Sequence, residues 1–341
     1  MTRPPEVSAI VVNHRSAAEA RGCVASLREA FNREGLSGEI VLVDCASGRA
    51  ETHALESLQA DQNVLLDDNR GYSGGVNAGM ARARSQRLLL ANADVVVLPG
   101  AVTALLDEIE DPGIGAAAPL CVWDSTGRLR LPADAGTGFL GELGARRFAP
   151  FARRTLSLWE QGGDAEHLVG AVLAARRDVF DRVGRFDERF LFEYEETEWE
   201  ERVRRAGLRL RFSPRARARH LFARSANRNP ETERRREVSR RLYRGRRYGA
   251  LGRAILESAG ERRSAGRSVS RLSEPAVPAR PGAWLAVSTN PSLIPFAGTP
   301  LSADFRLPDE VLESLPPGPV YLRVFGEKDG RPIETSVWEK P

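Results

Sequence analysis

Short apolar runs alternate with amphipathic segments over the first two-thirds of the chain. The runs at residues 7–13 and 39–44 are almost wholly apolar, as is typical of strands buried on both faces of a sheet. Between them, apolar side chains recur from Ala20 to Phe31 at the spacing of one helix face. Strands that alternate with helices in this way predict βαβ units, so the expected fold class is α/β with a mostly parallel sheet.

The same patterns predict further elements in this region. Strands are expected at residues 63–66, 87–91, 114–118, 167–175, 208–212 and 216–220, and helices at residues 75–84, from 99 onward, at 177–183 and at 195–206. Residues 125–165 are rich in Gly and Arg and have weak periodicity, which predicts loops, with a hairpin at residues 122–131.

Several predicted strands end in polar side chains, namely Asn13, Asp44, Asn92 and Asp94. In open α/β sheets, ligands bind in the crevice beyond the carboxyl ends of the strands. An unpaired carboxylate is costly to bury, and Asp94 follows a run of core residues. We therefore expect Asp94 to be solvent-accessible at a ligand crevice.

The composition changes after residue 224. A long basic stretch with helical character runs from about residue 231 to 263, and residues 273–282 are proline-rich. The last sixty residues alternate like strands and contain a hairpin turn, KDGRP. We divide the chain into an α/β domain (1–224), a basic helical segment (225–272), a linker (273–282) and a small β-rich accessory module (283–341).

The overall composition is that of a soluble globular protein. The chain has 341 residues, of which 42% are hydrophobic and 28% charged, and no run approaches the ~18 apolar residues of a membrane span. The start, MTRPPEV, has no apolar region of a secretory signal after it. Cys23, Cys45 and Cys121 form no C-x-x-C pair, so we expect reduced core cysteines in a cytosolic protein.

The net charge of +4 conceals a strong asymmetry. Residues 224–271 contain 15 Arg and 5 Glu, a charge of +10, so the rest of the chain carries −6. This segment is open to three interpretations: a solvated helix, a nucleic-acid surface or an interfacial helix. Val238, Leu242, Leu251 and Ile255 supply apolar pairs amid the Arg residues, which favours an anionic membrane surface. No recognised nucleic-acid-binding module accompanies them, so no nucleic-acid partner is expected.

Six motifs follow one another in a fixed order. They are VVNHRS (11–16), VDCAS (43–47), NRGYSGGVNAGM (69–80), LLLANADVVV (88–97), VGRFDERFLFEYEETEWEERVRRAG (183–207) and RARH (217–220). Together they resemble the family 2 inverting glycosyltransferases, and rhamnosyltransferase-like bacterial members in particular. The resemblance covers roughly residues 7–250. It implies a GT-A fold for residues 1–224, that is, a Rossmann-like, mostly parallel sheet with flanking helices.

The resemblance also assigns roles to residues. Glu196 takes the position of the catalytic base, with Glu195 as the reserve. Asp94 suits a metal ion because hard cations take oxygen ligands, and the resemblance implies His220 as the second ligand. Imidazole suits Mn²⁺ better than Mg²⁺, but the choice between the two ions is left open. The expected donor-binding residues are Asn13, Arg15, Asp44, Asn69, Gly71, Asn77 and Asn92.

Simpler interpretations exist for most of these residues. An Asp after a strand often belongs to a turn, a lone His is often structural, and acids in the first turn of a helix are favourable in any case. On that basis Glu193 and Glu200 are interpreted as solvated charge. The glycines from Gly71 to Gly75 do not follow the first strand, so they are no dinucleotide fingerprint, and we expect them to shape a loop beside the nucleotide.

Two departures from the family pattern concern carboxylates. Glu196 and Glu198 stand where the family has Asp, which keeps the charge but moves the carboxylate outward by one methylene. We expect this change to affect the rate and the acceptor geometry more than the reaction class.

The expected function is that of an inverting, metal-dependent glycosyltransferase in bacterial surface polysaccharide synthesis. The donor would be a dTDP- or UDP-sugar, with L-rhamnose as the leading sugar, and the acceptor a glycan or a polyprenyl-linked sugar. The expected location is cytoplasmic, with peripheral attachment to the inner face of the plasma membrane. One alternative is an inactive GT-A scaffold that binds nucleotide-sugar or glycan. A nucleotidyltransferase would need a Lys-bearing loop after the first strand, whereas the chain has only Lys328 and Lys340.

Overall fold

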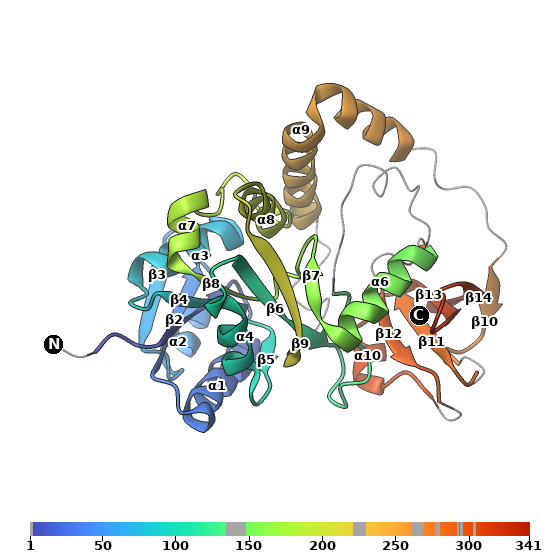
Figure 1. Ribbon diagram of the computed structural model, residues 1–341, viewed down its shortest axis with the longest axis horizontal. Helices are drawn as coiled ribbons and strands as arrows, with labels where there is room; N and C mark the ends of the chain where they lie inside the picture. Colours follow the sequence, from blue (N-terminus) through green and yellow to red (C-terminus); the bar gives the residue numbers. More distant parts are fainter. Residues whose placement is uncertain are drawn as a thin grey trace.

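The computed structural model describes residues 3–133, 148–220, 230–260, 269–276, 280–291, 293, 296–302 and 305–341. In these residues a nine-stranded sheet has the order β3-β2-β1-β4-β8-β6-β9-β5, with β7 paired to β9 (Figure 1). Its strands are β1 (Val7–Asn13), β2 (Gly38–Cys45), β3 (Gln62–Leu66), β4 (Arg87–Asn92), β5 (Val95–Val97), β6 (Ile114–Val122), β7 (Gly163–Ala165), β8 (Val172–Arg176) and β9 (Arg209–His220).

Most of these strands share one direction. The pairs β1–β2, β1–β4, β2–β3 and β6–β9 are parallel, while β8, β5 and β7 run against their neighbours. All seven residues of β1 are buried, because helices cover both faces of the sheet there. The predicted α/β class with a mostly parallel sheet is confirmed.

Two layers of helices enclose the sheet (Figure 1). The helices α1, α2 and α4 cover one face, and α3, α7 and α8 cover the other. Their bounds are α1 (Ala17–Glu34), α2 (Arg49–Glu56), α3 (Gly71–Arg82), α4 (Ala101–Glu110), α7 (Arg177–Val183) and α8 (Glu195–Arg205). Each face has its own apolar core, with alternate residues of β1 contributing to one or the other.

Helix α3 begins four residues earlier than predicted. Gly74 and Gly75 therefore lie inside the helix and do not shape a loop. A side chain at Gly75 would place its Cβ 2.5 Å from Cγ1 of Val12 on β1. These glycines allow the helix to pack closely against the sheet.

Three further differences from the prediction concern the second half of the sheet. The two strands expected at 208–212 and 216–220 form the single strand β9, with an irregular register against β6 between Pro119 and Leu120. The strand expected at 167–175 is β8 alone, which begins at Val172. Residues 125–165 contain a helix, α6 (Phe148–Gln161), and the strand β7, both of which were missed.

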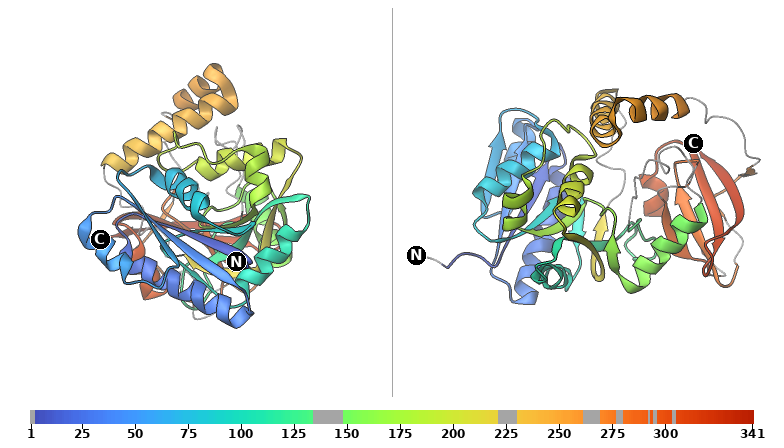
Figure 2. Two further views of the ribbon diagram at one scale, coloured as in Figure 1. Left: turned by 90° about the vertical axis from the view of Figure 1, so that its left-hand side faces the viewer. Right: turned by 45° about the horizontal axis from the view of Figure 1, so that its top comes forward.

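A second sheet of five strands forms the C-terminal part, with the order β10-β14-β13-β11-β12 (Figure 2). Its elements are β10 (Ser270–Leu272), β11 (Ala283–Ser288), β12 (Ala297–Pro300), α10 (Asp309–Ser314), β13 (Gly318–Gly326) and β14 (Pro332–Lys340). The β-rich character and the hairpin between β13 and β14 were predicted. Strand β10 comes before the proline-rich stretch and pairs with β14.

The two sheets are joined by direct packing. The rings of Trp159 on α6 and Trp284 on β11 stack with their centroids 5.4 Å apart. Arg130, beside the first sheet, exchanges two backbone hydrogen bonds of 2.8 Å with Gly298 on β12. The C-terminal sheet therefore completes the core beside α6.

Helix α9 (Pro230–Gly260) corresponds to the predicted basic stretch and extends across the top of the molecule (Figure 1). It is kinked at Gly249, whose φ of 68° is non-helical. Its second part exposes Leu251 (77%) and Ile255 (41%). Among the helices of the described ranges, none combines the length and the apolar character that crossing a bilayer requires.

Candidate active site

The polar ends of β1 and β2 meet at the carboxyl edge of the sheet. Asn13 and Asp44 are register partners, and Nδ2 of Asn13 donates to Oδ1 of Asp44 at 3.0 Å. The buried Asp44 carboxylate also accepts from the backbone N–H of Ser47 at 3.1 Å and from its hydroxyl at 2.5 Å. Ser47 in turn accepts from the backbone N–H of Arg15 at 2.8 Å. This network holds together the turns that follow both strands.

A cavity of about 630 Å³ opens beside this network. Asp44 lines it together with residues of α2 and of the end of β3, which are Ala46, Gly48, Arg49, Thr52, His53, Glu56, Leu65, Leu66 and Asp67. The cavity has the position expected for a ligand in an open α/β sheet. Its lining combines apolar surface with an acid that is already held by hydrogen bonds, as is typical of a ligand pocket.

The start of α3 is tied to the same edge of the sheet. Nδ1 of His14 lies 2.7 Å from the carbonyl of Cys45, and Nε2 lies 3.1 Å from Nδ2 of Asn69. Oδ1 of Asn69 accepts from the N–H of Gly71 at 3.0 Å. Burial lowers the pKa of His14, which favours the neutral ring. The sequence analysis missed His14, although it lies inside the first motif.

Gly71 and Asn77 position the loop that precedes α8. Gly71 has a φ of 69°, and an added Cβ would lie 2.7 Å from the carbonyl oxygen of Leu191. Nδ2 of Asn77 donates to the carbonyl of Phe186 at 2.9 Å and to Glu188 at 3.0 Å. Their proposed contact with the donor stays a prediction.

Asp94 and His220 lie together, as predicted for a metal site. His220 on β9 is paired with Val95 on β5, which brings Nε2 of His220 to 3.4 Å from Oδ1 of Asp94. The expectation of a solvent-accessible Asp94 is wrong, because only 4% of it is exposed. The reason is the β5–β9 pair, which places His220 against it. The backbone N–H of Asn92 donates to the carbonyl of Ala171, and Asn92 itself is partly exposed.

The donor atoms of this pair fit Mg²⁺ or Mn²⁺. Two ligands that are each about 2.1 Å from one ion lie roughly 3 Å apart, which is close to the observed separation. No group of three metal-binding side chains occurs within the residues that the structure describes. Such ions commonly complete their coordination with water and substrate phosphates. Asp94 and His220 would therefore hold the ion through one oxygen and one nitrogen.

The two candidate bases begin α8 directly after Tyr194, which has a positive φ of 70°. Burial and the charge of Glu196 raise the pKa of Glu195 well above its usual value. Burial, followed by the charge of Glu200, raises the pKa of Glu196 to about 7. A carboxylate of this kind changes its ionisation near neutral pH, as suits a general base.

Tyr72 lies at the start of α3. Its hydroxyl is buried and has no hydrogen-bond partner among the described residues. Burial raises the pKa of Tyr72, and the charges of Glu195, Glu196 and Asp94 raise it further. The raised pKa keeps the Tyr72 hydroxyl protonated near neutral pH. Sequence reasoning missed Tyr72, which lies within the glycine-rich motif.

The interpretation of Glu200 as solvated charge is wrong, whereas Glu193 is exposed as expected. Glu200 is fully buried and lies 3.2 Å from Nδ1 of His167. Glu193 pairs at the surface with Arg236. The helical pattern did not reveal that the segment before β8 covers this turn of α8.

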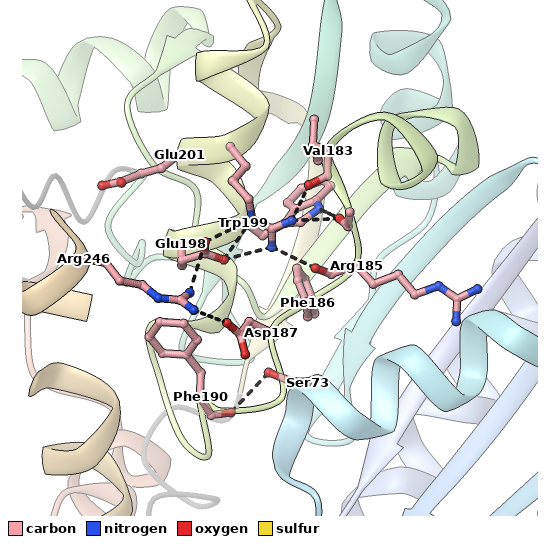
Figure 3. A network of polar contacts seen from close by, with 12 residues as sticks. Ser73, Val183, Arg185, Phe186, Asp187, Phe190, Glu198, Trp199, Glu201 and Arg246 are labelled. Carbon is pink, nitrogen blue, oxygen red and sulfur yellow. Dashed lines mark hydrogen bonds and ion pairs between the residues drawn. The ribbon is translucent and has the colours of Figure 1, made fainter. Parts of the chain in front are cut away.

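Glu198 and Asp187 belong to a network that fixes α8 in place (Figure 3). Arg202 contacts both carboxylate oxygens of Glu198 at 3.1 Å and donates to three backbone carbonyls of residues 183–185. Arg246 reaches over from α9 to Asp187 at 2.6 Å and to Glu198 at 3.5 Å. These carboxylates are used in ion pairs between α8, α9 and the preceding loop.

Comparison with known proteins agrees with this geometry. Residues 8–184 match the model of the family described as Glycosyl transferase family 2. The chain is 30% identical over 214 residues to N-acetylglucosaminyl-diphospho-decaprenol L-rhamnosyltransferase of Mycobacterium tuberculosis, which covers 56% of this chain and 69% of that protein. It is 31% identical over 112 residues to the succinoglycan biosynthesis protein ExoO of Rhizobium meliloti, and spans only 31% of that protein.

Two solved structures are also similar. GalNAc-T7 with UDP, GalNAc and Mn²⁺ aligns with a TM-score of 0.49 at 17% identity, over 76% of this chain and 55% of that chain. The mannosyltransferase PcManGT from Pyrobaculum calidifontis, in complex with GDP-Man and Mn²⁺, aligns with a TM-score of 0.48 at 16% identity, over 78% of this chain and 77% of that chain.

Proposed function

Since this chain belongs to glycosyl transferase family 2, we propose that it is an inverting, metal-dependent enzyme that transfers a sugar from a nucleotide-diphospho-sugar. The observation that carries the proposal is the buried pair of Asp94 and His220 at the end of the sheet, whose Oδ1 and Nε2 atoms lie 3.4 Å apart. This pair supports a divalent metal site of the kind that such a transfer needs.

In the proposed reaction, a single displacement at the anomeric carbon, each group of residues has a separate role. The acceptor oxygen forms a bond to the anomeric carbon, the bond from that carbon to the phosphate oxygen breaks, and the nucleoside diphosphate leaves. Glu196 takes the proton of the acceptor hydroxyl. A divalent ion held by Asp94 and His220 would neutralise the charge on the leaving diphosphate. The 630 Å³ cavity beside Asp44 would hold the nucleoside.

L-Rhamnose is the sugar we propose, with dTDP-L-rhamnose as its donor. The support is the similarity to the mycobacterial protein, whose name specifies an L-rhamnosyltransferase that uses a diphospho-decaprenol acceptor. A lipid-linked acceptor of surface polysaccharide synthesis lies at a membrane, and α9 suits such a surface. It contains nine Arg and four Glu, and it exposes Leu251 and Ile255 beyond its kink.

A panel of nucleotide sugars tests the donor. Purified protein is incubated with dTDP-L-rhamnose, UDP-glucose or GDP-mannose, with and without Mn²⁺, and the melting temperature and the release of nucleoside diphosphate are measured. We expect dTDP-L-rhamnose with Mn²⁺ to raise the melting temperature most and to be turned over. Turnover of another sugar would refute the rhamnose assignment, and turnover without any divalent ion would refute the metal role.

The alternative of a binding scaffold without activity is favoured by one observation, the Glu at the base position 196. A donor that raises the melting temperature but is neither hydrolysed nor transferred to any lipid-linked acceptor would support the scaffold. Binding to vesicles of phosphatidylglycerol tests the membrane surface separately. We expect binding at low salt and loss at high salt, because salt screens the attraction. If the protein does not bind such vesicles at low salt, α9 is not an interfacial helix.

A further inference from the structure

A buried pair of polar side chains, Glu200 and His167, lies one helical turn beyond the candidate base. Glu200 is 0% exposed and His167 is 3% exposed, and Oε2 of Glu200 lies 3.2 Å from Nδ1 of the imidazole. The backbone N–H of Leu168 also donates to the Glu200 carboxylate at 3.2 Å. A buried carboxylate persists only where partners compensate for its lost hydration, and here one short segment supplies them.

The same segment touches Glu196. Glu196 and Glu200 are four residues apart on α8, so they lie on one face of the helix. Gly170, three residues after His167, lies directly against the Glu196 side chain. An added Cβ there would be 2.8 Å from Cγ and 3.1 Å from Cδ of Glu196. Residues 167–170 therefore contact both carboxylates, holding one by hydrogen bonds and the other by close backbone packing.

We propose that His167 and Glu200 are positioning residues for Glu196, holding segment 167–170 against its side chain and setting the charge that it experiences. The inference rests on the proposed role of Glu196 as the base. Glu200 lies within the motif at residues 183–207, but neither it nor His167 was given a catalytic or binding role above, and both side chains lie too deep to contact a substrate.

The charged groups around Glu196 predict in which direction each substitution should shift its pKa. The charged groups that act on it are Glu195 from the start of its own helix, Glu193 from the loop just before that helix, Glu200 from the next turn and His167 from the covering segment, and its own charge acts on Tyr72 of α3. After burial, the Glu200 charge is the largest cause of the raised pKa of Glu196, and the imidazole of His167 opposes it. Removing each partner should therefore move the ionisation of Glu196 in opposite directions.

The experiment measures the titration of Glu196 in the intact protein. Glutamate labelled with ¹³C at the side-chain carboxyl is incorporated, and the Glu196 signal is assigned by its loss in Glu196→Gln. Glu200→Gln keeps the size of the side chain and an oxygen for the Leu168 N–H. We expect it to lower the Glu196 midpoint by about one unit, since a charge roughly 6 Å away at an effective dielectric of about 20 corresponds to ~2 units before solvent screening. His167→Gln should raise the midpoint.

The control is Glu166→Gln, which removes the exposed carboxylate next to His167 and should leave the midpoint unchanged. The acidic limb of the pH profile of kcat/KM should move with the NMR midpoint in each variant, whereas a merely structural effect would lower the rate at every pH.

Failure of the inference is distinguishable from failure of the proposed function. A Glu200→Gln protein whose Glu196 midpoint stays within about 0.2 units of wild type, or rises, overturns the inference even if sugar is transferred. If Glu200→Gln does not fold, the test is the His167→Gln protein, and a Glu196 midpoint that fails to rise in it overturns the inference. If no donor is turned over, the proposed function fails, and the NMR titration still decides whether the pair sets the charge at Glu196.

Discussion

Replacing Glu196 by Gln should stabilise the folded protein above neutral pH while removing most of its transferase activity. In the folded protein, burial and the neighbouring Glu200 raise the pKa of Glu196 from 4.5 to about 7. Because the folded-state pKa is raised, folding is favoured by the protonated form. That contribution is fully present below pH 4.5 and is lost as the pH rises through 7. Gln is neutral at every pH and avoids this loss.

The size of the effect follows from the shift. One pKa unit corresponds to about 1.36 kcal/mol, so the rise from 4.5 to about 7 gives an upper limit of roughly 3.4 kcal/mol. Glu196 keeps part of its surface in solvent, which screens its charge, so we expect a gain of about 1–2 kcal/mol near pH 8. The gain should approach zero as the pH falls toward 4.5. Loss of a general base should lower kcat by ~10²-fold or more.

Urea unfolding of both proteins near pH 8, 6.5 and 5, together with transfer assays, measures these quantities. Glu166→Gln serves as the stability control, because that carboxylate is exposed and its loss should change the free energy of unfolding little. Glu195→Gln serves as the control for activity and should reduce transfer less. A variant that is less stable than wild type near pH 8, or whose gain does not depend on pH, would refute the buried-charge account. Unchanged transfer would exclude Glu196 as the base.

Three further changes test other parts of the structure. Asp94→Asn should keep the fold but reduce the effect of Mn²⁺ on donor affinity at least ~10-fold, because the ion loses a charged ligand; isothermal titration with and without Mn²⁺ measures this. Gly71→Ala should lower the free energy of unfolding by about 1–3 kcal/mol, since its φ of 69° and the nearby Leu191 carbonyl both disfavour a side chain; urea unfolding checks it. Deleting residues 269–341 should expose the apolar face of α6 around Trp159 and abolish cooperative thermal unfolding, measured by circular dichroism.

Strands β1 and β2 were predictable because both are mainly apolar runs that are buried on both faces. Strand β1 is buried throughout since α1, which follows it in sequence, and α3 cover its two faces, and its polar end follows from the open edge of the sheet. Helix α6 was missed because its apolar residues pack against Trp284 and Phe296, which lie more than a hundred residues later. Its sequence also contains Arg and polar residues that weaken the period.

The proximity of Asp94 and His220 was predictable from the sequence, whereas the surroundings of the candidate residues were not. Strand ends and ordered motifs indicated Asp94, His220 and Glu196, whereas the burial of Asp94 depends on the pairing of β5 with β9. The contact of Glu200 with His167 depends in the same way on a segment that precedes β8 by only a few residues. A periodic pattern shows which face of a helix is apolar, but it does not show which backbone lies over the turn that carries the acids.

The longer side chain of Glu196 is matched by a glycine, Gly170, in the segment that covers it. A Glu places its carboxylate one methylene farther from the helix than the Asp of the family pattern, and Tyr194, with its φ of 70°, fixes where α8 begins. The extra methylene therefore needs room beyond the helix, toward the segment that covers it. At that point the covering residue is Gly170, where any side chain would come within 2.8 Å of Cγ of Glu196. The close backbone approach at Gly170 and the anchoring of its segment through His167 together hold Glu196 in a defined position, as its proposed role as the base would require.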